Sequence, residues 1–336
     1  MKVEQRLKNN MRETVPDFLT KRKLGYKSFF GFENKFNPFF LPLMCASHDT
    51  SVGLSTSIAV AFARSPMEMA LDSYSLNQLC EGRFKLGLGS QIKPHITRRF
   101  GMPWTDKPAT QMREYIAALH AIWDAFESGE RLNFEGETYR HTLLSPEFTP
   151  FIEGYGRPPV LLGAVGPGMT RAAAAVADGM ITHSFVSELS LRELNDVALQ
   201  KGLAERGKPR SEFELVYPVF IATGATEEEY KKNVEWHRHR IGFYASTPSY
   251  KVQLDLHGWG DLHYELNKMT KEGRWDELGQ PISDEMVDTF CVRGEPDDIA
   301  PIIKKRYSGL VDTIQSNLEL EDEETQYQII KQIEDI

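Results

Sequence analysis

Leu162-Gly163-Ala164-Val165-Gly166-Pro167-Gly168-Met169-Thr170 bears most directly on the fold, because an apolar strand breaks here into a glycine turn and enters the alanine-rich helix 171–177. A similar strand and glycine turn lie earlier in the chain, in Gly82-Arg83-Phe84-Lys85-Leu86-Gly87-Leu88-Gly89-Ser90. A helix that begins after such a turn offers unpaired backbone N–H groups to a phosphate. An ordinary strand-to-helix turn is the alternative. The two stretches predict an α/β fold with a place for an anionic cofactor.

Strand patterns and helix patterns alternate along the whole chain, which indicates parallel strands joined by helical crossovers. The expected strands are residues 2–4, 26–30, 52–62, 84–88, 160–163, 180–183, 213–222 and 310–314. Eight such strands close a (β/α)₈ barrel. The predicted fold class is therefore the α/β TIM barrel.

Capping signals and helical periodicity locate the helices. Ser65-Pro66-Met67-Glu68 combines an N-cap serine, a proline at the first helical position and a glutamate at the third, so a helix is expected from residue 66. Apolar residues recur at helical spacing from Met112 to Phe126, and Gly129 is expected to end that helix. Thr226 is predicted to cap a further helix. Residues 319–336 are expected to form a peripheral helix.

Two segments exceed what a minimal barrel needs. Residues 133–159 are predicted to form a short hairpin and a proline-rich loop, and residues 246–281 form a second insertion. Long insertions in compact domains often act as lids or binding loops. The whole chain, residues 1–336, is expected to be one domain.

Composition excludes several classes of function. The 336 residues carry 48 acidic and 39 basic side chains, a net charge of −9, which opposes binding to nucleic acid over a broad surface. Cys45, Cys80 and Cys291 are far apart, so neither a disulfide framework nor a metal site is expected. The polar N-terminus predicts neither a signal peptide nor a membrane anchor. We expect a cytoplasmic protein.

Several strings, in this order and spacing, resemble the luciferase-like flavin monooxygenase superfamily, and more narrowly its branch that uses the deazaflavin coenzyme F420. The resemblance runs from about residue 30 to about residue 311. The strings are residues 57–66 (SIAVAFARSP), 82–91 (GRFKLGLGSQ), 98–104 (RRFGMPW), 163–170 (GAVGPGMT), 243–248 (FYASTP) and 257–262 (HGWGDL).

The resemblance implies a bacterial-luciferase-like barrel that holds the coenzyme ring at the carboxyl ends of its strands. It implies a cis peptide between Ser57 and Ile58 behind the ring, and a homodimer. One glycine turn would flank the ring, and the other would hold the phosphodiester. The implied coenzyme-binding residues are Ser57, Ile58, Gly89, Ser90, Gln91, Gly163, Gly166, Pro167, Gly168, Met169, Thr170 and His183. For His183, a packed structural histidine is the alternative.

The exit of the second strand departs from the family's pattern. The superfamily commonly has a Glu-x-x-His-Asp-Pro-like string there, whereas this chain has Glu33-Asn34-Lys35-Phe36-Asn37-Pro38. Phenylalanine cannot transfer a proton, and asparagine cannot act as a base near neutral pH. Glu33, Lys35 and Asn37 remain the candidate catalytic residues. Phe36, Tyr244 and Trp259 are candidate walls of a substrate pocket.

Three functions follow from these observations. The leading one is an oxidoreductase that moves a hydride between coenzyme F420 and a small organic substrate. The second is a monooxygenase that uses FMN and O₂. The third, suggested by Phe36 and Asn37, is a catalytically degenerate barrel that serves as a binding or partner subunit.

Overall fold

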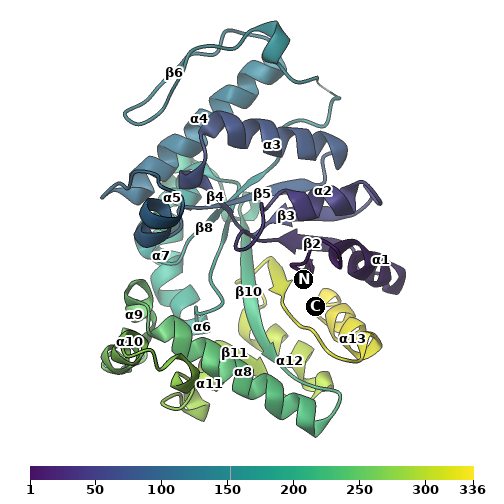
Figure 1. Ribbon diagram of the computed structural model, residues 1–336, viewed down its shortest axis with the longest axis vertical. Helices are drawn as coiled ribbons and strands as arrows, with labels where there is room; N and C mark the ends of the chain where they lie inside the picture. The colour runs from purple at the N-terminus through teal and green to yellow at the C-terminus, as the bar shows by residue number, and fades with distance from the viewer. Residues whose placement is uncertain (152) are drawn as a thin grey trace. The chain divides into compact units, whose positions relative to one another are not determined.

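The computed structural model describes residues 1–151 and 153–336 (Figure 1). Ile152, which belongs to the first predicted insertion, lies outside the described residues. The chain divides into two compact units. The first unit comprises Met1–Gln5, Thr182–Val197 and Leu215–Ile336, and the second comprises Arg6–Ile181 and Ala198–Glu214.

The second unit is built on parallel strands. β2 pairs with β3, β3 and β4 with β5, β5 with β8, and β8 with β9. The strands are β2 (Ser28–Gly31), β3 (Gly53–Thr56), β4 (Ala59–Val60), β5 (Phe84–Gly89), β8 (Val160–Gly163) and β9 (Gly179–Ile181). The helices are α1 (Thr14–Leu24), α2 (Phe40–Ala46), α3 (Pro66–Leu79), α4 (Pro108–Ser128), α5 (Pro167–Val176) and α7 (Asp196–Arg206).

The apolar faces of α3 and α4 pack against each other in this unit. The Trp123 indole N–H donates to the Ala70 carbonyl at 3.2 Å, and the Tyr74 and Phe126 rings meet edge to face at 5.6 Å. The predicted cap is confirmed, because the Ser65 hydroxyl accepts from the Glu68 N–H at 3.1 Å.

The first unit carries the other parallel strands, β1 (Lys2–Arg6), β10 (Glu214–Ala222), β11 (Cys291–Arg293) and β12 (Thr313–Ser316). β12 lies between β1 and β10, and β11 pairs with the far end of β10. Its helices are α6 (Glu188–Ser190), α8 (Glu227–Ala245), α9 (Lys251–Asp255), α10 (Leu262–Lys271), α11 (Asp284–Phe290), α12 (Pro296–Tyr307) and α13 (Glu323–Glu334). The chain termini lie close together, and the terminal ammonium donates to the Glu334 carbonyl (Figure 1).

The described residues therefore contain the eight parallel strands β1, β2, β3, β5, β8, β9, β10 and β12, with helices between them, and the predicted (β/α)₈ class is confirmed. The sequence pattern missed the extra strand β11. The first insertion contains the predicted hairpin, formed by β6 (Phe134–Glu135) and β7 (Arg140–His141). The second contains the helices α9 and α10. That residues 1–336 form one domain stays a prediction.

Two predicted elements need correction. The single strand expected over 52–62 was wrong, because β3 ends at Thr56 and β4 begins at Ala59. The pairing with β5 slips by one residue between them, as in a β-bulge. The helix expected over 171–177 begins earlier, at Pro167, because proline fits the first helical position and the Thr170 N–H donates to the Gly166 carbonyl.

Candidate functional site

The bulge between β3 and β4 contains the predicted cis peptide, Ser57–Ile58. The Ser57 N–H donates to the Gly31 carbonyl of β2 at 2.7 Å, and the Ile58 carbonyl accepts from the Glu33 N–H at 3.3 Å. The bulge is thus tied to the carboxyl end of β2, which is where a (β/α)₈ barrel places ligand-binding residues.

The ends of β5 and β8 lie against the same bulge. A Cβ atom added to Gly89 would stand 2.7 Å from the Ile58 Cδ1, and one added to Gly163 would stand 3.5 Å from the Ile58 Cγ2 and 3.1 Å from the Leu88 carbonyl oxygen. Glycine at 89 leaves room for the isoleucine. The structure therefore brings together Ile58, Gly89 and Gly163, three residues that the sequence assigned to the coenzyme.

Glu33 is held in a buried ion pair at this bulge. Its carboxylate accepts from the Arg64 guanidinium through two nitrogens, at 2.8 and 3.0 Å, and from the Val60 N–H at 2.7 Å. The side chains of Glu33 and Arg64 are only 5% and 11% exposed. Three donors occupy the carboxylate, so this geometry suits a residue that positions the bulge better than one that exchanges protons with a ligand.

The other candidate residues of that loop differ in their surroundings. Lys35 is exposed, and Phe36 is half-buried. The Asn37 side chain accepts from the Phe39 N–H at 2.9 Å, a local turn contact just before α2, whose own N-cap is Phe39. The Asn34 carbonyl accepts a hydrogen bond from Arg99. Of the three candidate catalytic side chains, Lys35 is the one that extends into solvent.

The N-terminus of α5 is open. Gly166 is the N-cap, with an extended backbone, and the cap has no side-chain hydrogen bond. A Cβ atom at Gly166 or Gly168 would meet no protein atom within 4 Å, and neither residue has a positive φ. The fold therefore does not require glycine at either position. Because Gly166 and Gly168 carry no side chains, the first-turn N–H groups of Gly168 and Met169 are accessible, which is the arrangement that binds phosphate.

The turn after β5 has a backbone feature of its own. Gln91 has φ of 61°, in the left-handed region that non-glycine residues seldom adopt, and its side-chain oxygen accepts from the Ile92 N–H at 3.0 Å. The Ser90 hydroxyl donates to the Gln91 carbonyl at 3.2 Å. Such conformations cluster at ligand-binding sites, which agrees with the role that the sequence suggested for this turn.

His183, two residues beyond β9, belongs to an aromatic cluster of the first unit. Its ring stacks on Tyr250 at 4.6 Å and meets Tyr244 edge to face at 4.5 Å. Its Nδ1 accepts from the Phe185 N–H at 3.0 Å, which leaves the proton of the neutral ring on Nε2. Burial, with a smaller effect of Arg240, lowers the pKa of His183 to about 4, so the ring is neutral near pH 7.

Tyr244 and Trp259, both predicted to line a substrate pocket, join the same aromatic cluster. Phe185 stacks on Phe290 at 4.3 Å and lies 6.3 Å from Tyr244, and the Phe290 ring lies 6.3 Å from Trp259. Trp259 also stacks on His257, whose Nε2 lies 2.8 Å from the Ser187 hydroxyl. That contact joins the second insertion to the segment after β9.

Three polar residues of the structure, Arg64, Arg240 and Glu4, were not identified from the sequence. Arg64 lies within the string 57–66 on which the family resemblance rested, but its partner Glu33 is far away in sequence. Nothing in the sequence distinguished Arg240 from its neighbours, because it follows other charged residues on a helix. Glu4 of β1 is buried and accepts from the Gln315 amide of β12 at 2.8 Å. Glu4 and Gln315 are register partners, so their side chains share one face of the sheet.

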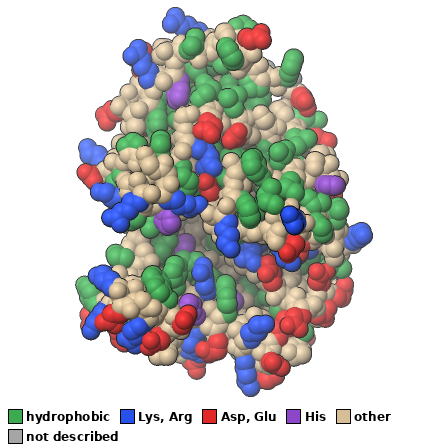
Figure 2. All heavy atoms as spheres, viewed as in Figure 1, with side chains coloured by type: hydrophobic (Ala, Val, Ile, Leu, Met, Phe, Trp, Pro, Cys, Tyr) green, Lys and Arg blue, Asp and Glu red, His purple; other side chains and the backbone are tan. Residues whose placement is uncertain are grey.

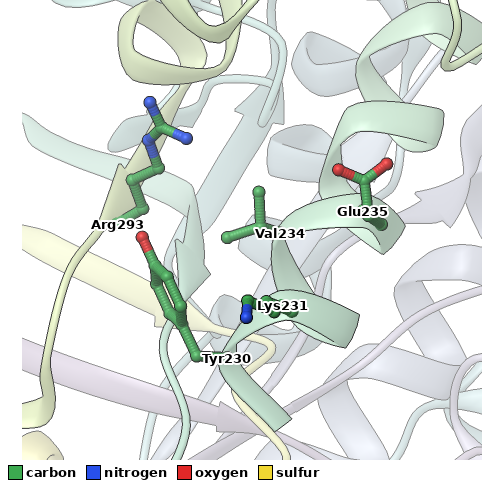
Figure 3. A pocket seen from close by; sticks show the side chains of 5 residues that line it. All are labelled: Tyr230, Lys231, Val234, Glu235 and Arg293. Carbon is green, nitrogen blue, oxygen red and sulfur yellow. The ribbon is translucent and has the colours of Figure 1, made fainter. Parts of the chain in front are cut away.

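A surface cavity of about 280 Å³ lies beside α8 (Figure 3). Tyr230 reaches from α8 toward Arg293 of β11, and Lys231, Val234 and Glu235 complete the lining. The Arg293 guanidinium is already paired with Asp288 through Nη2 at 2.9 Å. The face in Figure 2 shows basic and acidic side chains interspersed.

The described part of the chain holds no cluster of three or more His, Cys, Asp or Glu side chains that fits a metal ion. No helix within residues 1–151 or 153–336 has the length and apolar character needed to cross a membrane.

Comparison with known proteins gives one consistent result. The sequence model described as luciferase-like monooxygenase matches residues 18–313. An uncharacterised protein of Mycobacterium tuberculosis is 42% identical over 314 residues, which is 94% of this chain and 92% of the relative. The 5,10-methylenetetrahydromethanopterin reductase of Archaeoglobus fulgidus is 26% identical over 79% of this chain and 76% of its own. The solved coenzyme F420-dependent tetrahydromethanopterin reductase of Methanopyrus kandleri superposes with a TM-score of 0.78 at 16% identity, over 98% of this chain and 96% of its own.

Proposed function

The chain belongs to the luciferase-like monooxygenase family, and from this premise we propose that it is an oxidoreductase that transfers a hydride between coenzyme F420 and an organic substrate. The observation that carries the proposal is the open N-terminus of α5, where Gly166 and Gly168 leave unobstructed N–H groups for a phosphodiester. The Archaeoglobus fulgidus relative, which aligns with 79% of this chain, is a 5,10-methylenetetrahydromethanopterin reductase, and the similar Methanopyrus kandleri structure is a coenzyme F420-dependent tetrahydromethanopterin reductase.

The residues of the second unit fit such a coenzyme. The N–H groups of Gly168 and Met169 bind the phosphodiester, and the helix dipole favours its negative charge. The bulge at Ser57 and Ile58 supports the ring, and the buried pair of Glu33 and Arg64 keeps that bulge in place. When bound, the deazaflavin supplies the carbon that accepts or donates the hydride.

The protein's contribution to the reaction is mainly position and electrostatics. The hydride transfer itself moves no proton, and water at the open end of the site would supply the proton that completes reduction of a carbonyl or alkene group. The phenylalanine and asparagine in the loop after β2 are therefore compatible with activity. Lys35 is the exposed titratable group of that loop, and the Asn37 side chain accepts from the Phe39 N–H in the turn before α2. Phe36, Tyr244 and Trp259 remain the proposed contacts to the substrate.

A homodimer, which the family resemblance implied, is also part of the proposal. Phe40 and Leu43 on α2, and Leu71 and Leu79 on α3, are 36% to 50% exposed. Large exposed apolar side chains along a helix are typical of surfaces that another chain covers. We also propose a cytoplasmic location.

Titration of the purified protein with F420 and, separately, with FMN tests the proposal through quenching of coenzyme or protein fluorescence. We expect saturable binding of F420 that is at least tenfold tighter than binding of FMN. Tight FMN binding without F420 binding would favour the monooxygenase instead. F420 binding without oxidation of the reduced coenzyme by any of a broad set of carbonyl and alkene substrates would favour a degenerate binding subunit.

A further inference from the structure

Arg240 of α8 carries a positive charge that no side chain of the described residues neutralises. Its Nη2 donates to the Tyr244 hydroxyl at 2.5 Å, and its guanidinium carbon lies 4.9 Å from the centre of the Tyr244 ring and 5.3 Å from that of Phe243. Its Nε is buried and has no acceptor. A buried donor without an acceptor is uncommon, because its desolvation is not compensated.

Nearby arginines of the same unit are neutralised. Arg238, two residues earlier on α8, pairs with Asp284 at 2.6 Å and with Glu235 at 3.0 Å. Arg293 pairs with Asp288. Arg240 instead contacts aromatic rings, which attract a cation but leave its Nε–H without an oxygen acceptor.

His183 contributes a second unused donor. The Phe185 N–H occupies its Nδ1, so the neutral ring presents Nε2–H, for which the described residues provide no acceptor. The ring position is fixed by Tyr250 on its face and Tyr244 at its edge. The depressed pKa keeps the ring in this donor form near neutral pH.

Tyr244 connects the two residues, because it accepts from Arg240 and packs against His183. Its oxygen is occupied by the guanidinium, so its own O–H also acts as a donor. The three side chains together offer hydrogen-bond donors and one net positive charge. The chemical group that satisfies such a set is an acceptor with negative charge.

We propose that Arg240, His183 and Tyr244 recognise an anionic oxygen group, a carboxylate or a phosphate, on the substrate. The proposal rests on the proposed function in treating the bound molecule as the substrate, because the coenzyme phosphodiester is assigned to α5. The aromatic rings of Tyr244 and Tyr250 favour a planar or apolar group next to the anion. The expected substrates are therefore organic acids or phosphate esters.

Calorimetric titration of the coenzyme-free protein with benzoate and with inorganic phosphate, at constant ionic strength, tests the proposal. Benzoate represents a carboxylate beside a planar ring. We expect at least one probe to bind, and Arg240→Met to weaken that binding tenfold or more. His183→Phe, which keeps a ring without the donor, weakens it threefold or more. Arg240→Lys, which keeps the charge but loses the planar fork, gives an intermediate loss.

Lys232→Met is the matched control, since Lys232 is exposed on the same helix and its loss removes the same charge. We expect it to change the affinity less than twofold. Thermal unfolding and F420 titration of each variant separate loss of the site from loss of the fold or of the coenzyme. The proposal is overturned if neither probe binds the wild-type protein. Equal weakening by Arg240→Met and Lys232→Met would also contradict it.

Discussion

Replacing Arg64 by methionine removes the partner of a buried carboxylate. Glu33 is 5% exposed, and Arg64 supplies two of the three hydrogen bonds to its carboxylate. Breaking a buried pair by removing one partner costs about 3–5 kcal/mol, since the remaining charge is desolvated and unpaired. We expect about 3 kcal/mol here, because the Val60 N–H stays in place.

The assay is urea unfolding followed by circular dichroism. With a slope of about 3 kcal/mol per molar urea for a chain of this size, the midpoint falls by about 1 M. Arg140→Met is the control, because Arg140 and Glu135 form a pair that is 71% and 56% exposed and contributes less than about 1 kcal/mol.

A second variant separates loss of charge pairing from loss of packing. Adding Glu33→Gln to Arg64→Met removes the unpaired charge while keeping an acceptor for the Val60 N–H. The double variant is expected to recover more than half of the lost stability. The reasoning is refuted if Arg64→Met costs no more than Arg140→Met, or if the double variant is less stable than Arg64→Met.

The remaining predictions concern pH, the helix end and a glycine. Burial lowers the pKa of His237 to about 4, so below about pH 6.5 the unfolded chain takes up a proton that the folded chain does not. The free energy of unfolding therefore falls by up to about 3 kcal/mol between pH 6.5 and 4. In urea unfolding at several pH values, this fall is expected to be smaller for His237→Gln, and an equal fall would contradict the prediction. Gly168→Asp is expected to raise stability slightly, because the helix dipole favours a carboxylate in the first turn of α5. The same charge is expected to weaken F420 binding about tenfold by repelling the phosphodiester. An F420 affinity equal to that of the unmodified protein would place the phosphate elsewhere. Gly87→Ala is expected to cost about 3 kcal/mol or more or to prevent folding, because its Cβ would lie 1.9 Å from the Thr56 carbonyl oxygen. Gly166→Ala is the control, since a Cβ there meets open space and is expected to change the urea midpoint little. Similar midpoints for the two variants would contradict the packing argument.

The fold was predictable because its signals are local. The Ser65 cap and the Thr226 cap depend on residues three positions away, and both are present in the structure. The split of the predicted 52–62 strand was not predictable from periodicity. The apolar alternation continues through Ile58 and Val60, while the one-residue slip against β5 depends on how a neighbouring strand pairs.

The parts of the candidate site that the backbone forms were predictable from the sequence. The parts that depend on pairing between side chains were less predictable. Gly166 and Gly168 stood out because they join an apolar strand to a helix, where backbone N–H groups without a side chain in the way suit a phosphate. Arg64 and Arg240 did not stand out, since the importance of a charge depends on whether the fold supplies a partner. Arg64 is paired with Glu33, whereas no carboxylate of the described residues pairs with Arg240.

A crystal structure of the protein with bound F420 tests the central claim most directly. We predict that phosphodiester oxygens lie within hydrogen-bonding distance of the Gly168 and Met169 N–H groups, and that the ring rests against the Ser57–Ile58 bulge. A phosphodiester bound away from the N-terminus of α5, or a ring that leaves the bulge uncovered, would contradict it.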